Sequence, residues 1–357
     1  MTKKLGIGVI GLGRLGSSYA KYFAGRITGA ALVAVSDVNE TAVASLAAEL
    51  GISKRYSRYQ DLIADEEVDG VVIVSPTSTH KEIVFEAAKQ RKPIFCEKPL
   101  SIALPEARAM LRTVEETGVF FQMGFMRRFD KGYVAAKHKI EEGAIGTPVV
   151  FKSSSRDPYR PSLEYLDPAH SGGLFIDCGI HDLDLARWYM GEITSVYSIG
   201  GTLAYPEMKT IGDIDNAITS LYFTSGALGT IDLSRNGVYG YDIRTEILGT
   251  EGTVKIGYLR ETPILVMTKD GITHDTVPYF TERFEQAYIT QLQDFVNNVL
   301  QGKPPAVTCA DGVAALQASA AATLSFKENR PVKIEMANSS NGDDPSSTET
   351  VSETAPD

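Results

Sequence analysis

The strongest constraint on the fold is a glycine-rich turn close to the N-terminus. The apolar run Leu5 to Ile10 leads directly into Gly11-Leu12-Gly13-Arg14-Leu15-Gly16, and a helical stretch begins near Leu15. In a strand–turn–helix unit of this kind the first glycine permits the tight turn, the second lets a pyrophosphate approach the backbone, and the third lets the helix pack on the strand. The N–H groups and dipole at the helix N-terminus favour an anion. These residues therefore predict a dinucleotide-binding loop.

An acidic residue at the end of the second predicted strand supports this interpretation. Asp37 lies 21 residues beyond Gly16 and is followed by Val38 rather than by Lys or Arg. A carboxylate at that point accepts hydrogen bonds from the adenosine ribose hydroxyls and repels a 2′-phosphate, so we expect NAD rather than NADP. The alternative is that Asp37 only caps the helix that begins near Glu40.

The first third of the chain alternates short apolar runs with helix-like segments. The runs are Leu5 to Ile10, Ala31 to Val35, Val71 to Val74, Ile94 to Cys96 and Val119 to Met123. Segments such as Glu82 to Gln90 and Pro105 to Thr117 between them have helical composition. This alternation predicts an α/β fold, with a doubly wound parallel sheet of the Rossmann type over residues 1–124.

From about Pro148 the pattern becomes β-rich, with short glycine-containing connections between successive strands. The expected strands are Ser195 to Leu203, Asn216 to Phe223, Ala227 to Ser234, Asp242 to Leu248 and Gly252 to Ile256. Helices are expected at Gly179 to Met190, Glu282 to Leu300 and Ala310 to Lys327. Residues 125–336 are therefore predicted to form an α+β domain whose open, mostly antiparallel sheet has helices on one face.

The other face of that sheet needs water or another protein. The strand with Ala217, Ile218, Leu221, Tyr222 and Phe223 carries apolar groups on both sides, which predicts a homo-oligomer (dimer or tetramer) formed through the open sheet face.

Composition narrows the class of protein further. The 357 residues carry 45 acidic and 35 Lys or Arg residues, a net charge of −10, which argues against a nucleic-acid partner. No apolar run reaches the length of a membrane span, so we expect a cytoplasmic protein with no membrane partner. The cysteines, Cys96, Cys178 and Cys309, are too far apart to suggest a disulfide framework or a metal site. Residues 337–357 are acidic and rich in Ser, Thr and Pro, which predicts a disordered tail.

Polar residues follow the predicted strands at the sheet edge where α/β folds bind ligands. Ser75, Pro76, Thr77 and His80 follow the third apolar run, Glu97-Lys98-Pro99 follows the fourth, and Phe125 to Arg128 follows the last. We expect the first four, together with Glu97 and Lys98, to line the cofactor site. His80 could equally well only cap its helix.

A second constellation occupies Gly172 to Asp184. It contains Asp177 and His181, four residues apart and therefore on one face at the beginning of a helix. A histidine there is biased toward the neutral form, which can accept a proton. The alternative is a structural, buried histidine.

Together, Gly11 to Gly16, Glu97-Lys98-Pro99 and Gly172 to Asp184 resemble the glucose-fructose oxidoreductase and inositol dehydrogenase (Gfo/Idh/MocA) family of NAD(P)-dependent sugar and polyol dehydrogenases. The similarity extends from Leu5 to about Glu335. The stretches Gly124 to Asp130, Ser155 to Pro158 and Tyr239 to Asp242 most resemble inositol 2-dehydrogenases.

The resemblance implies oxidation of a cyclic polyol, with Lys98, Asp177 and His181 as catalytic residues and no metal. It also implies polyol contacts from Arg128, Asp157 and Tyr239, besides Asp177 and His181. Inositol dehydrogenases often have His-Arg-Asn-Pro where this chain has Ser155-Arg156-Asp157-Pro158, which leaves the inositol isomer open. The alternatives are a pyranose dehydrogenase, an NAD-retaining glycosidase of the same fold, and a non-catalytic NAD-binding sensor.

Overall fold

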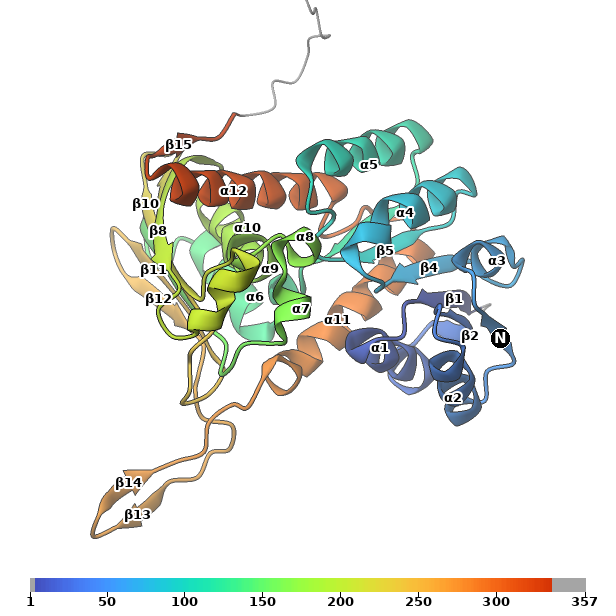
Figure 1. Cartoon of the computed structure of the whole chain (residues 1–357), viewed down its shortest axis with the longest axis horizontal. Coiled ribbons are helices and arrows are strands. Elements are labelled where there is room, and N and C mark those ends of the chain that lie inside the picture. The colour runs from blue at the N-terminus through green and yellow to red at the C-terminus, as the bar shows by residue number, and fades with distance from the viewer. Residues whose placement is uncertain (1–3, 336–357) are drawn as a thin grey trace, which may run out of the picture.

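Two sheets organise the chain, which we describe over residues 4–335 of a computed structural model (Figure 1). The first sheet is parallel, in the order β3-β2-β1-β4-β5-β6. Its strands are β1 (Leu5–Ile10), β2 (Ala30–Ser36), β3 (Lys54–Tyr56), β4 (Gly70–Ile73), β5 (Ile94–Glu97) and β6 (Phe121–Gly124). Every residue of β1, β4, β5 and β6 is buried, because helices cover both faces of the sheet.

The covering helices divide between the two faces. The pairs α1 (Arg14–Gly25) and α2 (Glu40–Leu50), and α4 (His80–Lys89) and α5 (Leu104–Thr117), contribute to separate apolar cores. The short helix α3 (Tyr59–Ala64) packs with α4. The predicted doubly wound parallel sheet is therefore confirmed.

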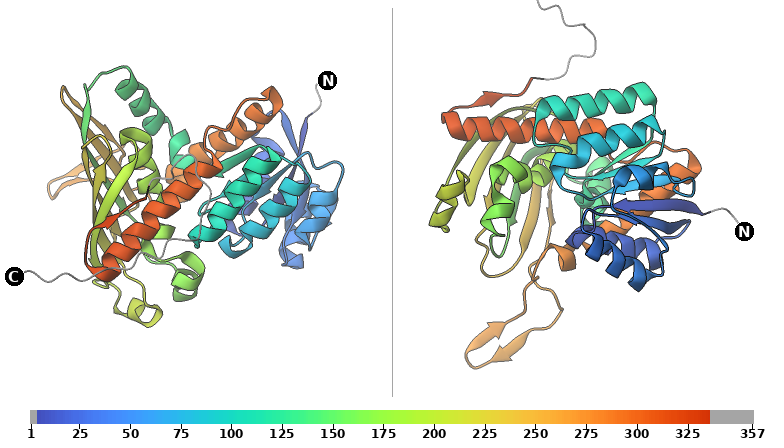
Figure 2. Two further views of the ribbon diagram at one scale, coloured as in Figure 1. Left: turned by 90° about the horizontal axis from the view of Figure 1, so that it is seen from above. Right: turned by 45° about the vertical axis from the view of Figure 1, so that its right-hand side comes forward.

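The second sheet is mixed, in the order β12-β11-β7-β10-β9-β8-β15. Its strands are β7 (Pro148–Arg156), β8 (Ile193–Gly201), β9 (Asn216–Phe223), β10 (Leu228–Ser234), β11 (Asp242–Gly249), β12 (Thr253–Ile256) and β15 (Val332–Lys333). Only β7 and β10 pair in parallel. Helices α6 (Lys131–Glu141), α10 (Ile180–Met190) and α12 (Cys309–Glu328) lie on one face (Figure 2). Helices on one face were expected, but the predicted covering helix Glu282 to Leu300 packs on the first sheet instead.

Two long C-terminal helices connect the sheets. Helix α11 (Phe280–Gln301) follows the second sheet in sequence but packs on the first, where Phe295 contacts Phe95 edge to face at 5.9 Å. Helix α12 packs on both α5 and β8. The predicted division at residue 124 therefore separates the two sheets but not the helices that cover them.

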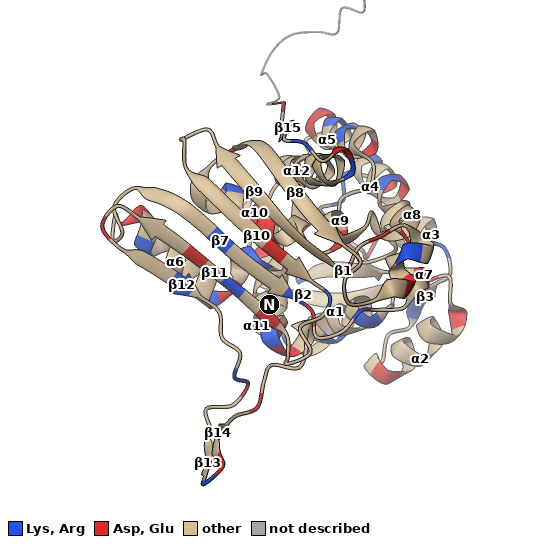
Figure 3. Cartoon of the chain, turned by 60° about the vertical axis from the view of Figure 1, so that its left-hand side comes forward, with Lys and Arg blue, Asp and Glu red and all other residues tan. Residues whose placement is uncertain are grey.

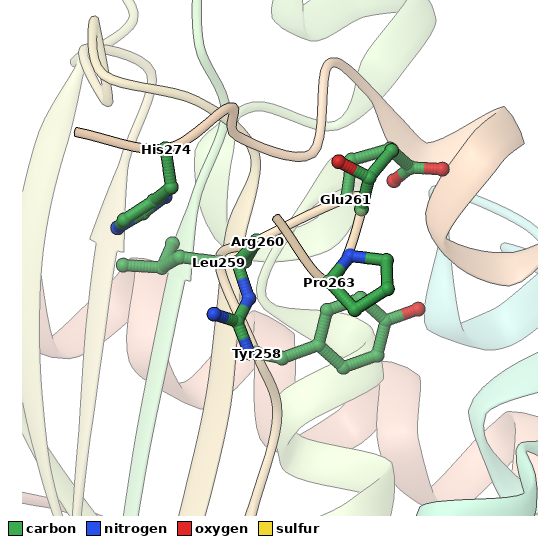
Figure 4. A pocket seen from close by; sticks show the side chains of 7 residues that line it. Tyr258, Leu259, Arg260, Glu261, Pro263 and His274 are labelled. Atoms are coloured by element: carbon green, nitrogen blue, oxygen red, sulfur yellow. The ribbon is translucent and has the colours of Figure 1, made fainter. Parts of the chain in front are cut away.

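A hairpin arm of β13 (Val266–Thr268) and β14 (Gly271–Thr273) projects from the body between β12 and α11 (Figure 1). This hairpin was not predicted from the sequence. A hollow of ≈ 480 Å³ lies at the base of the arm (Figure 4), lined by Tyr258, Leu259, Arg260, Glu261, Thr262, Pro263 and His274. None of these residues was predicted to bind a ligand.

Short helices complete the fold: η1 (Thr77–Thr79), η2 (Met126–Phe129), α7 (Leu163–Leu166), α8 (Pro168–Ser171), α9 (Leu174–Asp177) and η3 (Pro206–Ile211). In the part of the chain that the structure describes, no helix combines the length and apolarity needed to cross a bilayer. The predicted acidic tail lies outside the described residues.

Candidate active site

The glycine loop after β1 has the geometry that a dinucleotide needs. Gly11 has φ = +91°, and a Cβ there would lie 2.5 Å from the Ser75 nitrogen. A Cβ on Gly16 would lie 1.9 Å from the Gly11 oxygen, whereas one on Gly13 would meet nothing within 4 Å. Gly13 is the N-cap of α1 and no side chain caps that helix. The second glycine therefore faces open space at a free helix N-terminus, which fits a pyrophosphate.

Asp37 lies beside this loop at the end of β2. Its Oδ2 accepts a hydrogen bond from the Leu12 N–H at 2.6 Å and its Oδ1 accepts one from the Asn39 N–H at 2.8 Å. The N-cap of α2 is Asn39, whose side chain accepts from the Ala42 N–H, so the helix-capping alternative for Asp37 is wrong. Val38 is 91% exposed and adds no positive charge. The Asp37 carboxylate can accept hydrogen bonds from the ribose hydroxyls of NAD, and Val38 provides no positive charge for the 2′-phosphate of NADP.

The segment after β4 is held in place by His80. Ser75 and Pro76 follow the strand, Thr77 begins η1, and His80 is the first residue of α4. The two ring nitrogens of the buried His80 each lie 3.0 Å from a backbone oxygen, one of Ser75 and one of Pro99. Burial lowers the pKa of His80. The ring thus connects the ends of β4 and β5, and its nitrogens are not directed at a cofactor.

Glu97 is likewise directed into the protein. Its buried carboxylate accepts hydrogen bonds from the Tyr19 hydroxyl, from the Lys98 N–H at 3.1 Å and from the Gln291 side chain at 3.4 Å. Burial raises its pKa. Because Tyr19 is on α1 and Gln291 on α11, Glu97 fixes the end of β5 from which Lys98 projects.

Lys98 and Asp177 come together between the two sheets. The Lys98 Nζ donates to the Asp177 backbone oxygen at 2.8 Å and lies 3.7 Å from its Oδ1. Asp177 is the last residue of α9. Burial alone would raise the pKa of Asp177, but the positive charges of Lys98 and Arg235 lower it below the usual value. The carboxylate is therefore ionised near neutral pH.

His181 lies in the first turn of α10. Its ring is buried, contacts Phe125 edge to face at 6.2 Å, and its Nδ1 has no hydrogen-bond partner among residues 4–335. Burial, followed by the charges of Lys98 and Arg127, holds its pKa well below the usual value. A neutral imidazole is suited to accept a proton.

Of the three further residues predicted to contact the polyol, the structure brings one into this group. Asp157, just beyond β7, has its Oδ2 3.5 Å from the Cys178 Sγ and 3.8 Å from an Arg235 nitrogen. Burial raises the pKa of Asp157, and the negative charge of Asp177 also raises it.

The structure does not bring the other two into this group, and their polyol contacts stay a prediction. The Arg128 guanidinium donates from Nε and Nη2 to Asp184 and from Nη2 to Asp311, and the side chain is only 9% exposed. The Tyr239 hydroxyl donates to Asp242 at 2.7 Å and accepts from Arg156. Neither side chain contacts Lys98, Asp177 or His181.

Sequence reasoning missed three residues of the site. Arg127 donates to Asp182 at 2.8 Å and to the Ser155 hydroxyl at 3.0 Å, in the buried network next to His181. Arg235 donates to the Asp177 Oδ2 at 2.9 Å, and the Tyr165 hydroxyl lies 3.5 Å from Oδ1. Arg235 directly follows a predicted strand, which was a usable signal, whereas nothing in the sequence distinguishes Tyr165.

Comparison with known proteins agrees with this site. Residues 5–125 match the model described as "Oxidoreductase family, NAD-binding Rossmann fold", and residues 137–334 match "Oxidoreductase family, C-terminal alpha/beta domain". The chain is 44% identical to the scyllo-inositol 2-dehydrogenase (NAD(+)) of Bacillus subtilis over 92% of its length and 96% of the relative. It is 42% identical to the myo-inositol 2-dehydrogenase of Thermotoga maritima, with 92% and 98% coverage.

A solved structure also shares the whole architecture. The scyllo-inositol dehydrogenase of Lactobacillus casei, crystallised with NAD(H) and scyllo-inositol, superposes with a TM-score of 0.88 at 32% identity, covering 93% of this chain and 99% of the other. The expected resemblance is therefore confirmed, and the chain belongs to the Gfo/Idh/MocA family of NAD-dependent oxidoreductases.

Proposed function

We propose that the protein is an inositol 2-dehydrogenase, which oxidises the secondary alcohol of scyllo- or myo-inositol to a ketone with NAD+. The observation that carries the proposal is the meeting of Lys98, Asp177 and His181, with Lys98 leaving the same edge of the first sheet as the glycine loop. Relatives at 44% and 42% identity are named as scyllo- and myo-inositol 2-dehydrogenases. The proposal extends that activity to this chain.

Each residue of the group has a distinct role in this reaction. His181 removes the hydroxyl proton, since its ring is neutral. Lys98 donates a hydrogen bond to the same oxygen and stabilises its developing negative charge. Asp177 accepts a hydrogen bond from a neighbouring hydroxyl and orients Lys98. Gly11 to Gly16 and Asp37 would hold NAD+, which would supply the hydride acceptor for the carbon that carries this oxygen.

The surrounding acceptors match a ring that carries several hydroxyl groups. Asp157 and Asp177 present carboxylates at one side of the group, and Tyr165 adds a hydroxyl. We assign Asp157 to a second polyol hydroxyl, because a desolvated carboxylate needs donors that the substrate can supply.

The test is NADH formation, followed by absorbance, with myo-inositol, scyllo-inositol, D-chiro-inositol, D-glucose and D-xylose, each with NAD+ and with NADP+. We expect turnover of one inositol with NAD+. Turnover of a pyranose alone would indicate a sugar dehydrogenase. NAD binding without net NADH formation on any substrate would contradict the proposal and favour the glycosidase or the sensor.

Lys98→Ala checks the catalytic assignment. The variant should bind NAD with nearly wild-type affinity, because its side chain faces Asp177 rather than the glycine loop, while kcat falls by about 10³-fold or more through loss of charge stabilisation. A variant that keeps its activity would contradict the role of Lys98.

We further propose that the open face of the second sheet forms a homo-oligomer contact. Strands β8 and β9 contain no charged residue, as Figure 3 shows, and their outward side chains include Tyr197, Ile199, Ile218 and Tyr222, each at least 36% exposed. A hollow of ≈ 380 Å³ on this face, partly lined by Ile199 and Ile218, can accept a side chain of a second copy. Whether the assembly is a dimer or a tetramer is read from its mass in solution.

A further inference from the structure

One buried guanidinium lies between the two carboxylates of the site. The Arg235 side chain is 1% exposed, with one terminal nitrogen 2.9 Å from the Asp177 Oδ2 and the other 3.8 Å from the Asp157 Oδ2. Nothing in the mechanism above requires this arginine to touch substrate.

The second sheet fixes the position of this side chain. Strands β7 and β10 are parallel neighbours, so Asp157 and Arg235 leave the same sheet edge side by side. The Asp157 N–H donates to the Ser234 oxygen at 2.8 Å, and the Arg235 N–H donates to the Asp215 oxygen at 2.9 Å. These backbone hydrogen bonds fix the main chain at Asp157 and Arg235, and thereby place the guanidinium next to the two carboxylates.

The contacts divide the two oxygens of Asp177. Oδ2 is bound by Arg235, whereas Oδ1 faces the Lys98 Nζ at 3.7 Å and the Tyr165 hydroxyl at 3.5 Å. Only one orientation of the carboxylate satisfies both sets of contacts. Arg235 thus selects which oxygen is presented to Lys98 and to a substrate hydroxyl.

We propose that Arg235 is a positioning residue for the dehydrogenation, which anchors Asp177 through a buried ion pair and turns its Oδ1 toward Lys98. The inference rests on the proposed function and adds a residue that acts through Asp177. Two buried carboxylates next to one another repel, and a cation between them lets both remain ionised.

Several charged or titratable groups face Asp177, and they determine how the pKa of Asp177 changes when Arg235 is removed. Lys98 approaches from β5, Asp157 from the end of β7, Tyr165 from α7, and Asp213 from the segment before β9, while Cys178 is the next residue in sequence. Without Arg235, Lys98 is the only cation of this set, opposed by burial and by Asp157. The pKa of Asp177 must then rise.

The experiment compares Arg235→Met and Arg235→Lys with wild type. The chain offers a matched control, Arg283→Met, because Arg283 is also buried and paired with one aspartate, Asp130, away from the site. For Arg235→Met we expect kcat to fall at least about tenfold through misorientation of Asp177, with little change in NAD affinity. Arg235→Lys should recover part of kcat, since it restores the charge without the fork. The control should lower the melting temperature and leave kcat near wild type.

Titration of ¹³C-labelled aspartate carboxyls by NMR separates this inference from the proposed function, because it needs no substrate. In Arg235→Met one carboxyl should titrate about one pH unit or more higher than in wild type. Asp157→Asn, which removes the opposing carboxylate, should shift the same signal downward, and it remains informative if Arg235→Met does not fold. An unshifted carboxyl in a folded Arg235 variant, or a loss of kcat equal to that of the control, would overturn the inference. An inactive wild type with shifted titration would instead refute the proposed substrate alone.

Discussion

Arg128 carries a buried charge that two carboxylates share. Its guanidinium donates to Asp184 and to Asp311, and it lies 5.8 Å from the ring centroid of Trp188. Burial raises the pKa of Asp184 despite this pairing. Arg128, Asp184 and Asp311 lie on η2, α10 and α12, respectively. Their ion pairs therefore hold the segment before α6 against the core.

Replacing Arg128 therefore tests whether this side chain stabilises the fold or binds the substrate. Arg128→Met leaves the buried carboxylate of Asp184 without its ion pair, which should lower the free energy of unfolding by about 3–5 kcal/mol. The KM for the polyol should stay within about twofold of wild type, because Arg128 contacts none of Lys98, Asp177 and His181. Urea denaturation and steady-state kinetics check both values. A stable variant with a KM raised tenfold would place Arg128 at the substrate after all.

His181 sets the acid side of the pH profile. The reaction needs the neutral ring, and burial together with Lys98 and Arg127 lowers the pKa, so the neutral form persists below the ordinary value of about 6.5. We expect kcat/KM to be retained at pH 6 and to fall only at lower pH. His138→Gln, an exposed histidine on α6, should leave the profile unchanged. A profile that falls with a pKa of about 6.5 or above would contradict the assignment of His181 as the base.

At the scale of elements, the three glycines of the β1–α1 turn differ in whether the fold has room for a larger side chain in their place. Gly13 has φ = −63° and open space around its missing Cβ, whereas a Cβ on Gly16 would collide with the Gly11 oxygen. Gly13→Ala should thus keep its melting temperature within a few degrees, with a Kd for NAD raised about tenfold or more because the methyl occupies the phosphate approach. Gly16→Ala should lower the melting temperature instead. Differential scanning fluorimetry and NAD titration by fluorescence separate the two, and tight NAD binding by Gly13→Ala would contradict the loop assignment.

The elements that the sequence predicts best are those with a strong local pattern. Strand β9 has the predicted bounds, Asn216–Phe223, because its β-branched and aromatic residues are followed directly by a glycine-containing turn. Strand β3, Lys54–Tyr56, has only three residues at the sheet edge and carries no such pattern. The packing of α11 on the first sheet was not predictable either, since an apolar helix face does not specify which sheet it covers.

The candidate site shows the same division between local and tertiary information. The end of β5 locates Lys98, whereas Asp157 was identified only through the family resemblance. Asp177 and His181 were expected on one face of a single helix, but Asp177 ends α9 and His181 lies in the first turn of α10. The sequence does not predict in which direction a side chain points. Arg127 and Arg128 are adjacent in a 3₁₀ helix, where successive side chains point about 120° apart. Arg127 therefore lies next to His181 and Arg128 next to Asp184, and no sequence spacing distinguishes them.

At the scale of the whole molecule, the site depends on how the two sheets are held together. Lys98 follows β5 of the first sheet, whereas Asp177 ends α9, which contacts α10 and α12 on the helix-covered side of the second sheet (Figure 1). Gln291 on α11 donates to the Tyr19 hydroxyl, which in turn donates to Glu97 beside Lys98. Helix α12 contacts α5 and β8 at once. Both long C-terminal helices thus fix the separation between Lys98 and Asp177.

The open face of the second sheet gives the last prediction. Ile218 and Tyr222 are 50% and 56% exposed on the uncharged strand β9, and a contiguous apolar patch of this kind is typical of an interface. A copy packed on this face must desolvate any charge placed there, so Ile218→Lys combined with Tyr222→Glu should shift the protein to a monomer in light scattering. Leu324→Lys, which changes a 40% exposed leucine on α12, should leave the mass unchanged. Since Lys98, Asp177 and His181 lie on the helix-covered side, the folded monomer should retain its affinity for NAD. A wild-type protein that is already monomeric, or a double variant that keeps the wild-type mass, would show that this face does not join the copies.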